Sequence, residues 1–205
     1  MHIIYLHGFD NTSNSIKGGL LVDYIQKSHP NHQVHCPDLN LKPAEVLAKV
    51  TKLINELSQT DKVVLVGSSL GGYFSTHLSN QLGCPALLLN PSVAPHTTLT
   101  RFFADGKTYG ADDEVFYTTV GDWNVTYGDM RWVADNQLLT VNHPNKIAVW
   151  LKTADEVLNY QVAESFYGSN GVKQLIIHEG GDHRIADFDE HLDMVLEVLN
   201  NLVSG

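Results

Sequence analysis

The sequence predicts an α/β protein in which a parallel sheet of six strands, in the order 2-1-3-4-5-6, is covered by helices on both faces. Two observations support this prediction. Short apolar segments alternate along the chain with longer segments of helical periodicity. The short segments are apolar throughout, which is typical of strands that are buried on both faces. The length of 205 residues suits a single domain, 1–205.

Six segments are expected as strands because they are short, apolar and bounded by turn-forming residues. In chain order they are His2–Leu6, His32–Cys36, Val63–Val66, Ala86–Leu89, Ile147–Leu151 and Gln174–His178.

Helical periodicity fills most of the intervals between these strands. Ser15–Ser28 is expected to be a helix that stops near Pro30. The helix that begins at Pro43 spaces its apolar residues three and four apart, which places them on one buried face. A further helix is expected at Leu70–Gln81. The chain closes on a helix with one apolar face, formed by Phe188, Leu192, Val195, Leu196, Leu199 and Leu202.

The stretch from Pro95 to Asn145 interrupts the alternation after the fourth strand. It is rich in aromatic residues and has no clear period. Long loops within a compact domain are usually functional. We therefore interpret 95–145 as an insertion over the carboxyl edge of the sheet and over the active site. Its aromatic side chains are expected either to wall an acyl site and limit acyl length, or to form a small core of their own.

The acidic composition limits the classes of partner. The formal net charge is -10, which argues against nucleic acid and disfavours an anionic membrane surface. No apolar run reaches the ~20 residues that span a bilayer. The start, MHIIYLHGF, lacks the basic segment of a signal peptide. We expect a cytoplasmic protein that acts on a small molecule.

The strongest chemical motif is Gly-x-Ser-x-Gly, centred on Ser69 between the third strand and the next helix. A nucleophilic serine at such a strand–turn–helix junction sits in a strained turn, and the glycines let the backbone pass closely on both sides. The dipole of the following helix favours negative charge nearby. A plain serine-glycine turn or a phosphate-binding loop is the alternative interpretation. Ser68 is one position too early for this role.

A second motif, Leu6-His7-Gly8-Phe9, directly follows the first strand. A turn at this place can supply a backbone N–H to an oxyanion hole, and we predict that of Phe9. The residue after the nucleophile, Leu70, would supply the second N–H. The alternative is that Gly8 only turns the chain. His7 is expected to be structural or to line the pocket.

A general base is expected at the end of the last strand, where the sequence reads Glu-Gly-Gly-Asp-His. From a glycine-rich loop at this edge, His183 can reach Ser69 across the sheet. The chain has 11 histidines. Among the others, His178 lies in a strand and His191 on the last helix, and His96 and His143 belong to or border the insertion.

The acid that orients His183 is predicted to be Asp155, at the tip of the fifth strand. Its alternative role is a helix N-cap. Glu156 is expected to begin the next helix, and Asp182, next to the base, to diverge from the imidazole.

Taken together, these motifs resemble the small bacterial YqiA-type esterases. The similar segments are LHGF, GSSLGGY, NPSV, TADEVLNY and EGGDH, in this order along essentially the whole chain. The resemblance implies a compact α/β-hydrolase without the first two strands of larger members, with Ser69, Asp155 and His183 as its triad. It implies esterase activity on short acyl esters.

The sequence therefore predicts a serine esterase that works through an acyl-enzyme on a small acyl ester. Neither a metal nor an organic cofactor is expected, because no ligand cluster or dinucleotide motif is present. A thioesterase or a peptidase would use the same residues. A non-catalytic binding module on the same scaffold is the alternative from another class, and a doubly wound nucleotide or flavin binder is permitted by the fold alone.

Overall fold

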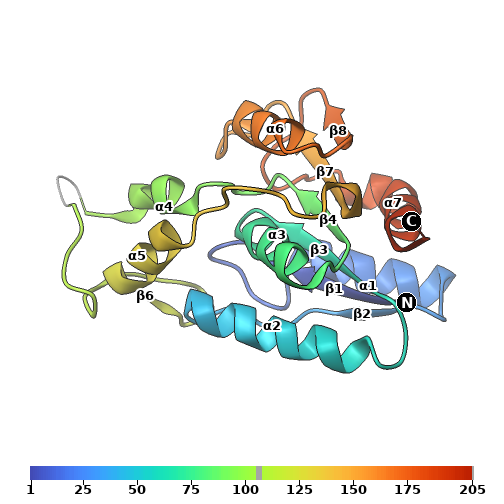
Figure 1. The fold of residues 1–205 in the computed structure, drawn as a ribbon, viewed down its shortest axis with the longest axis horizontal. Coiled ribbons are helices and arrows are strands. Elements are labelled where there is room, and N and C mark those ends of the chain that lie inside the picture. The colour runs from blue at the N-terminus through green and yellow to red at the C-terminus, as the bar shows by residue number, and fades with distance from the viewer. Residues whose placement is uncertain (105–107, 205) are drawn as a thin grey trace.

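A six-stranded parallel sheet forms the centre of the fold in the computed structural model, which describes residues 1–104 and 108–204 (Figure 1). Its strands are β1 (His2–Leu6), β2 (Gln33–His35), β3 (Val63–Ser68), β4 (Ala86–Leu89), β7 (Ile147–Lys152) and β8 (Gln174–His178). They lie in the order β2-β1-β3-β4-β7-β8. Counted within this sheet alone, the order is 2-1-3-4-5-6, so the predicted fold class is confirmed.

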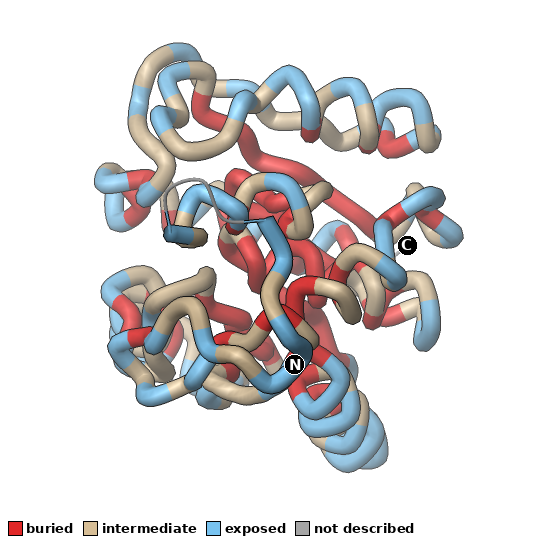
Figure 2. The backbone as a smooth tube through the Cα atoms, turned by 90° about the vertical axis from the view of Figure 1, so that its left-hand side faces the viewer, coloured by how far each residue is buried: buried red, intermediate tan, exposed pale blue. Residues whose placement is uncertain are grey.

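Two apolar cores lie on the two faces of the sheet. On one face, α1 (Ile16–Ser28) and α7 (Leu192–Ser204) pack against one set of strand residues. On the other face lie α2 (Pro43–Leu57), α3 (Leu70–Leu82) and α6 (Tyr160–Ser169). Figure 2 shows the buried strands between helices whose outer sides are exposed. Because both faces are covered, the strands lack the alternation of polar residues that a half-exposed sheet would have.

The predicted insertion has regular structure that its sequence did not indicate. It contains α4 (Pro95–Thr98), a 3-10 turn (Leu99–Phe102), the antiparallel strands β5 (Val115–Thr118) and β6 (Asn124–Thr126), α5 (Tyr127–Asp135) and a second 3-10 turn (Pro144–Lys146). These elements are too short to establish a period. Residues 105–107 of the insertion, and residue 205, lie outside the described residues.

Aromatic side chains of the insertion form two clusters. Phe103, Tyr109, Phe116 and Tyr127 pack on one another and make a core of their own. Phe102, Tyr117 and Trp123 instead surround the ring of Phe9, which follows β1. The second cluster joins the insertion to the end of the sheet.

A helix was expected to begin at Glu156, but α6 begins at Tyr160. Its first turn is capped by Asn159, whose Oδ1 accepts the N–H of Gln161. Only Ala163 and Tyr167 are fully buried on it, so its apolar stripe is too narrow to stand out as a periodic pattern. Within the described residues, no helix combines the length and the apolar character that crossing a bilayer requires.

The start of α3 packs closely against the end of β1. A Cβ atom on Gly71 would lie 2.0 Å from the carbonyl oxygen of Leu6 and 2.8 Å from that of His7. Since both neighbours are backbone atoms, neither can move aside without displacing β1. Gly71 is therefore required by close approach.

We predict that Gly71→Ala lowers the free energy of unfolding by about 3 kcal/mol, the upper end of the usual cost of overpacking. Gly19→Ala is the matched control, because a Cβ there meets nothing within 4 Å. On helix propensity alone the control should gain up to about 1 kcal/mol. Urea denaturation of both variants measures the difference, and equal stabilities would contradict the argument.

Candidate active site

Ser69 occupies a strained turn between β3 and α3. Its backbone angles are φ 54 and ψ -116, a region that residues with a side chain rarely adopt. The turn is held from both sides, since the Ser69 N–H donates to the carbonyl of Leu89 at 3.0 Å and its own carbonyl accepts the N–H of Ser92 at 3.0 Å. These bonds to the end of β4 fix the Ser69 side chain at the carboxyl edge of the sheet.

The flanking glycines are needed because this turn is crowded. A Cβ on Gly67 would lie 2.3 Å from the hydroxyl of Ser75 and 2.5 Å from the carbonyl of Gly71. The spacing Gly-x-Ser-x-Gly is thus a consequence of how tightly the strand and the helix pack.

Three predicted residues come together in one line of hydrogen bonds. Nε2 of His183 lies 3.0 Å from Oγ of Ser69, and Nδ1 lies 2.7 Å from Oδ2 of Asp155. The Asp155 side chain is 2% exposed and that of His183 15%. With Nδ1–H donating to the carboxylate, Nε2 accepts the serine hydroxyl. This arrangement can remove the proton of Ser69 as its oxygen attacks an electrophile.

Asp155 also performs the local role that was its alternative interpretation. Its second oxygen accepts the N–H groups of Val157 at 2.8 Å and Leu158 at 2.7 Å. Both oxygens are therefore engaged, and the carboxylate is fixed in the plane that meets the imidazole.

The two neighbouring carboxylates do not contact the imidazole. Glu156 was expected to begin the next helix, but the chain continues as a turn until Asn159 and α6 begins at Tyr160. Oε2 of Glu156 instead accepts the backbone N–H of His183 at 3.0 Å. Oδ1 of Asp182 accepts the N–H of Ala186 at 2.9 Å within its own loop. Glu156 therefore positions the backbone beside His183, a role that no sequence pattern indicated.

Asn90 is a second residue whose role sequence reasoning missed. It follows β4 with a left-handed φ of 41. Its Nδ2 donates to the carbonyls of Asp182 and His183 at 3.1 and 3.2 Å, and its Oδ1 accepts the N–H of Lys152 at 2.9 Å. A polar residue after an apolar strand was the available signal, and it does not distinguish an anchor from a turn.

An ion pair between a buried lysine and a partly exposed aspartate lies beneath the loop that carries His183. Nζ of Lys152 lies 2.6 Å from Oδ2 of Asp187, which also contacts Nε2 of His191 at 3.1 Å. Burial opposes ionisation of Asp187, but the hydrogen bonds from Lys152 and His191 hold its pKa below the usual range. A Cβ on Gly181 would lie 2.6 Å from the Lys152 side chain, so the loop rests directly on this lysine.

A second lysine, from α1, holds the same loop. Nζ of Lys17 donates to the carbonyl of Arg184. Burial lowers the pKa of Lys17 to about 8, with the nearby Asp182 opposing the shift. His178 and His191 both pack around Trp150, which is consistent with the structural roles expected for histidines other than His183.

The predicted oxyanion donors flank the nucleophile. A Cβ on Gly8 would lie 3.2 Å from Cβ of Ser69, so the turn after β1 abuts the elbow. Leu70 begins α3, where the first N–H groups have no partner within the helix. Among hydrogen bonds within the described residues, none uses the N–H of Phe9 or Leu70.

His7 fixes this turn and, as expected, is structural. Its Nδ1 lies 2.9 Å from the carbonyl of Gly8, and its Nε2 accepts the N–H of Leu39 at 3.0 Å. Burial lowers the pKa of His7, although the Gly8 hydrogen bond and Asp38 oppose the shift. The neutral form is the one that can accept from Leu39 while donating to Gly8.

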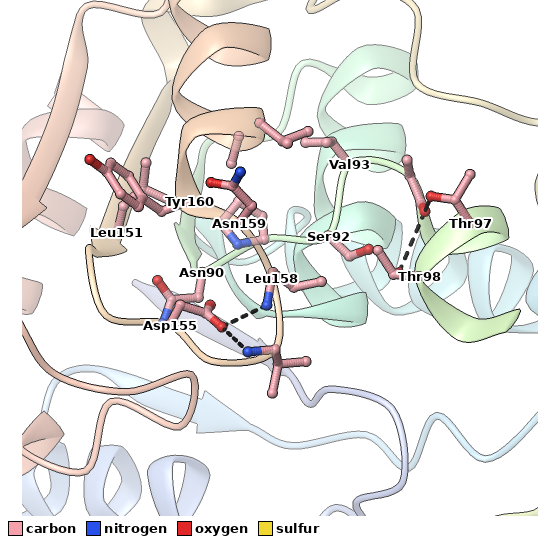
Figure 3. A pocket seen from close by; sticks show the side chains of 15 residues that line it. Asn90, Ser92, Val93, Thr97, Thr98, Leu151, Asp155, Leu158, Asn159 and Tyr160 are labelled. Carbon is pink, nitrogen blue, oxygen red and sulfur yellow. Dashed lines mark hydrogen bonds between the residues drawn. The ribbon is translucent and has the colours of Figure 1, made fainter. Parts of the chain in front are cut away.

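An apolar cavity of about 180 Å³ adjoins the acid of the triad (Figure 3). It lies between the segment that follows β4 and the segment from Asp155 into α6. About half of its lining residues are aliphatic, and the others carry hydroxyl, amide or carboxylate groups: Asn90, Pro91, Ser92, Val93, Ala94, Thr97, Thr98, Leu151, Asp155, Val157, Leu158, Asn159, Tyr160, Val162 and Ala163. Within the described residues, no cluster of three or more His, Cys, Asp or Glu side chains is placed to hold a metal ion.

The comparisons with known proteins agree with this fold. Residues 2–200 match the model of the uncharacterised protein family UPF0227. The chain belongs to this family. A UPF0227 protein of Vibrio parahaemolyticus is 31% identical over 211 residues, which cover 97% of this chain and 99% of the relative. The YqiA-type resemblance seen in the sequence is confirmed.

Solved structures of low sequence identity share the fold. Mouse alpha/beta hydrolase domain-containing protein 10 superposes with a TM-score of 0.70 at 17% identity, covering 98% of this chain and 90% of that protein. Est1E from Butyrivibrio proteoclasticus, solved with ferulic acid bound, gives a TM-score of 0.71 at 13% identity, covering 99% and 88%. These likenesses establish an α/β-hydrolase fold for the UPF0227 chain.

Proposed function

We propose that this UPF0227 protein is a serine hydrolase that cleaves carboxylic esters of short acyl chains through an acyl-enzyme. The observation that supports it most is the line of hydrogen bonds from Asp155 through His183 to Ser69, with the serine in a strained elbow. Such a line is needed to make a serine hydroxyl nucleophilic at neutral pH.

In the proposed first step, Oγ of Ser69 attacks the ester carbonyl carbon as Nε2 of His183 takes its proton. Asp155 stabilises the imidazolium that forms. The carbonyl oxygen becomes an oxyanion between the N–H groups of Phe9 and Leu70. Collapse breaks the ester bond, and the leaving alkoxide takes the proton from His183.

The second step returns the enzyme to its starting state. Water replaces the alcohol, loses a proton to Nε2 of His183 and attacks the acyl-Ser69 carbonyl. The carboxylic acid leaves, and Ser69 recovers its proton. All groups needed for both steps are supplied by the chain, and the size of the neighbouring cavity, about 180 Å³, supports short acyl groups.

We predict that a fluorophosphonate labels Ser69 and no other serine, and that Ser69→Ala lowers kcat for p-nitrophenyl acetate by on the order of 10⁶. Intact-protein and peptide mass spectrometry locate the adduct. Ser68→Ala is the matched control, since Ser68 is the preceding buried serine of the same turn. Labelling that survives in Ser69→Ala would refute the assignment of the nucleophile.

The acid can be identified among three adjacent candidates. Asp155→Asn should fold but lose about 10⁴ in kcat, because the amide favours the wrong imidazole tautomer. Glu156→Gln and Asp182→Asn should lose far less, since their carboxylates accept backbone N–H groups and do not meet the ring. Steady-state kinetics on the three variants test this ranking, and a mild effect of Asp155→Asn would show that another group orients His183.

A further inference from the structure

The cavity beside Asp155 is linked to the nucleophile through one of its lining residues, Ser92. Ser92, which lines the cavity, donates its backbone N–H to the carbonyl of Ser69 at 3.0 Å. Asp155 lines the same cavity while it contacts His183 at 2.7 Å. A chain bonded to Ser69 therefore has an apolar space within reach.

The size of the cavity limits what can fill it. An apolar cavity of about 150 Å³ holds a benzene molecule, so about 180 Å³ suits a chain of roughly six carbons. Aliphatic side chains from both walls make the contact, including Val93, Ala94, Val157 and Leu158.

One buried polar atom in this lining has no partner. Ser92 is 5% exposed, and its Oγ makes no hydrogen bond within the described part of the chain. Leaving a buried hydroxyl unpaired costs free energy. A hydrocarbon ligand would leave that cost in place, whereas a ligand hydroxyl would remove it.

We infer that this cavity binds the acyl chain of the substrate and that Ser92 selects short chains bearing a hydroxyl group. This inference rests on the proposed ester hydrolysis. The aliphatic side chains exclude water from the acyl chain, and the buried, unpaired Ser92 hydroxyl supplies a polar contact. Specificity arises because a site with a buried polar group rejects ligands that leave it unpaired.

The test compares p-nitrophenyl butyrate with p-nitrophenyl 3-hydroxybutyrate and 4-hydroxybutyrate. Wild-type kcat/KM should be about tenfold higher for one of the two hydroxylated esters than for the butyrate, and Ser92→Ala should abolish that preference. Ser79→Ala is the matched control, because Ser79 is also buried with an unpartnered Oγ but lies in α3 and does not line the cavity. It should keep the wild-type preference.

A second variant tests the cavity without touching Ser92. Ala94→Leu should narrow it and shift the best chain length among p-nitrophenyl esters from roughly six carbons towards two. Fluorophosphonate labelling of each preparation separates the two proposals. An enzyme that labels at Ser69 but shows no hydroxyl preference overturns the cavity assignment alone, and an unlabelled wild type overturns the proposed function.

A different set of contacts joins the insertion to the oxyanion turn. The two carboxylate oxygens of Asp10 accept the hydroxyl of Tyr117 at 2.8 Å and the backbone N–H of Val120 at 2.8 Å. Asp10 has a left-handed φ of 53. The hairpin of β5 and β6 thus fixes Asp10 in this left-handed conformation.

The ring of Phe9 is fixed by the same hairpin. Its centroid lies 5.5 Å from that of Tyr117 and 6.0 Å from that of Trp123, and 5.1 Å from that of Phe102. The side chains of Phe9 and Asp10 are therefore both attached to the insertion, and the N–H of Phe9 has little freedom to turn.

The geometry points to Asp10 and Tyr117 as positioning residues that aim the N–H of Phe9 at the oxyanion. A hydrogen-bond donor that already points at the oxyanion needs no reorganisation when negative charge develops there. On this inference, the insertion acts on the transition state through the turn after β1, in addition to any wall it forms.

Steady-state kinetics distinguish a positioning role from a wall. Tyr117→Phe and Asp10→Asn should each lower kcat about tenfold with little change in KM, and should weaken binding of a boronic acid by the same factor. The kcat of the double variant should fall no further than that of the more impaired single variant, because both substitutions remove the same contact between Asp10 and Tyr117. Tyr109→Phe, in the other aromatic cluster, is the control and should match wild type. A rise in KM at constant kcat would show that the hairpin only walls the substrate.

Discussion

The close packing of the elbow against the end of β1 is the constraint on which the rest of the site depends. Gly71 brings the first turn of α3 against the carbonyls of Leu6 and His7, and this contact sets how far Ser69 stands from the turn after β1. A larger residue would separate the nucleophile from the N–H of Phe9. The oxyanion donors and the serine are therefore held together by one close contact between the backbone of α3 and the end of β1.

The imidazole is held by a different set of interactions, which come from the ends of β4 and β7. Asn90 ties the loop around His183 to the N–H of Lys152, and Glu156 accepts the N–H of His183 itself. The loop also rests on Lys152 through Gly181. The base is thus aimed by neighbouring strands of the same sheet, and its distance to Ser69 follows from their fixed spacing of ~4.8 Å.

The strands and the triad could be predicted because their signals are local. A doubly buried strand is apolar throughout, and the elbow needs glycines on both sides of Ser69. Glu156 and Asn90 could not be assigned in this way, because each acts on a loop far away in sequence. The sequence around Glu156 suits a helix start as well as a turn, and only the packing of α6 decides between them.

The insertion was difficult to predict for a related reason. Its stabilising contacts are between aromatic rings brought together by short elements, so they leave no period in the sequence. Phe103 and Phe116 contribute to a core of its own, whereas Phe102 and Tyr117 face Phe9. Both alternative roles for these rings depend on tertiary contacts, and composition alone could not separate them.

Backbone strain is concentrated where these sets of contacts meet. Among the described residues, the non-glycine residues in the left-handed region are Asp10, Ser69, Asn90, Asp122 and Ile185. Asp10 lies in the oxyanion turn, Ser69 in the elbow and Ile185 in the loop of His183. Asn90 anchors that loop, and Asp122 lies in the hairpin that holds Asp10.

Such conformations cost about 1–3 kcal/mol each and persist only where surrounding contacts over-determine them. Here those contacts are identifiable: the bonds of Ser69 to the end of β4, the three bonds of Asn90, and the hairpin's hold on Asp10. Stability from the two apolar cores is thus used to hold the carboxyl edge of the sheet in a geometry that the local sequence would not adopt alone.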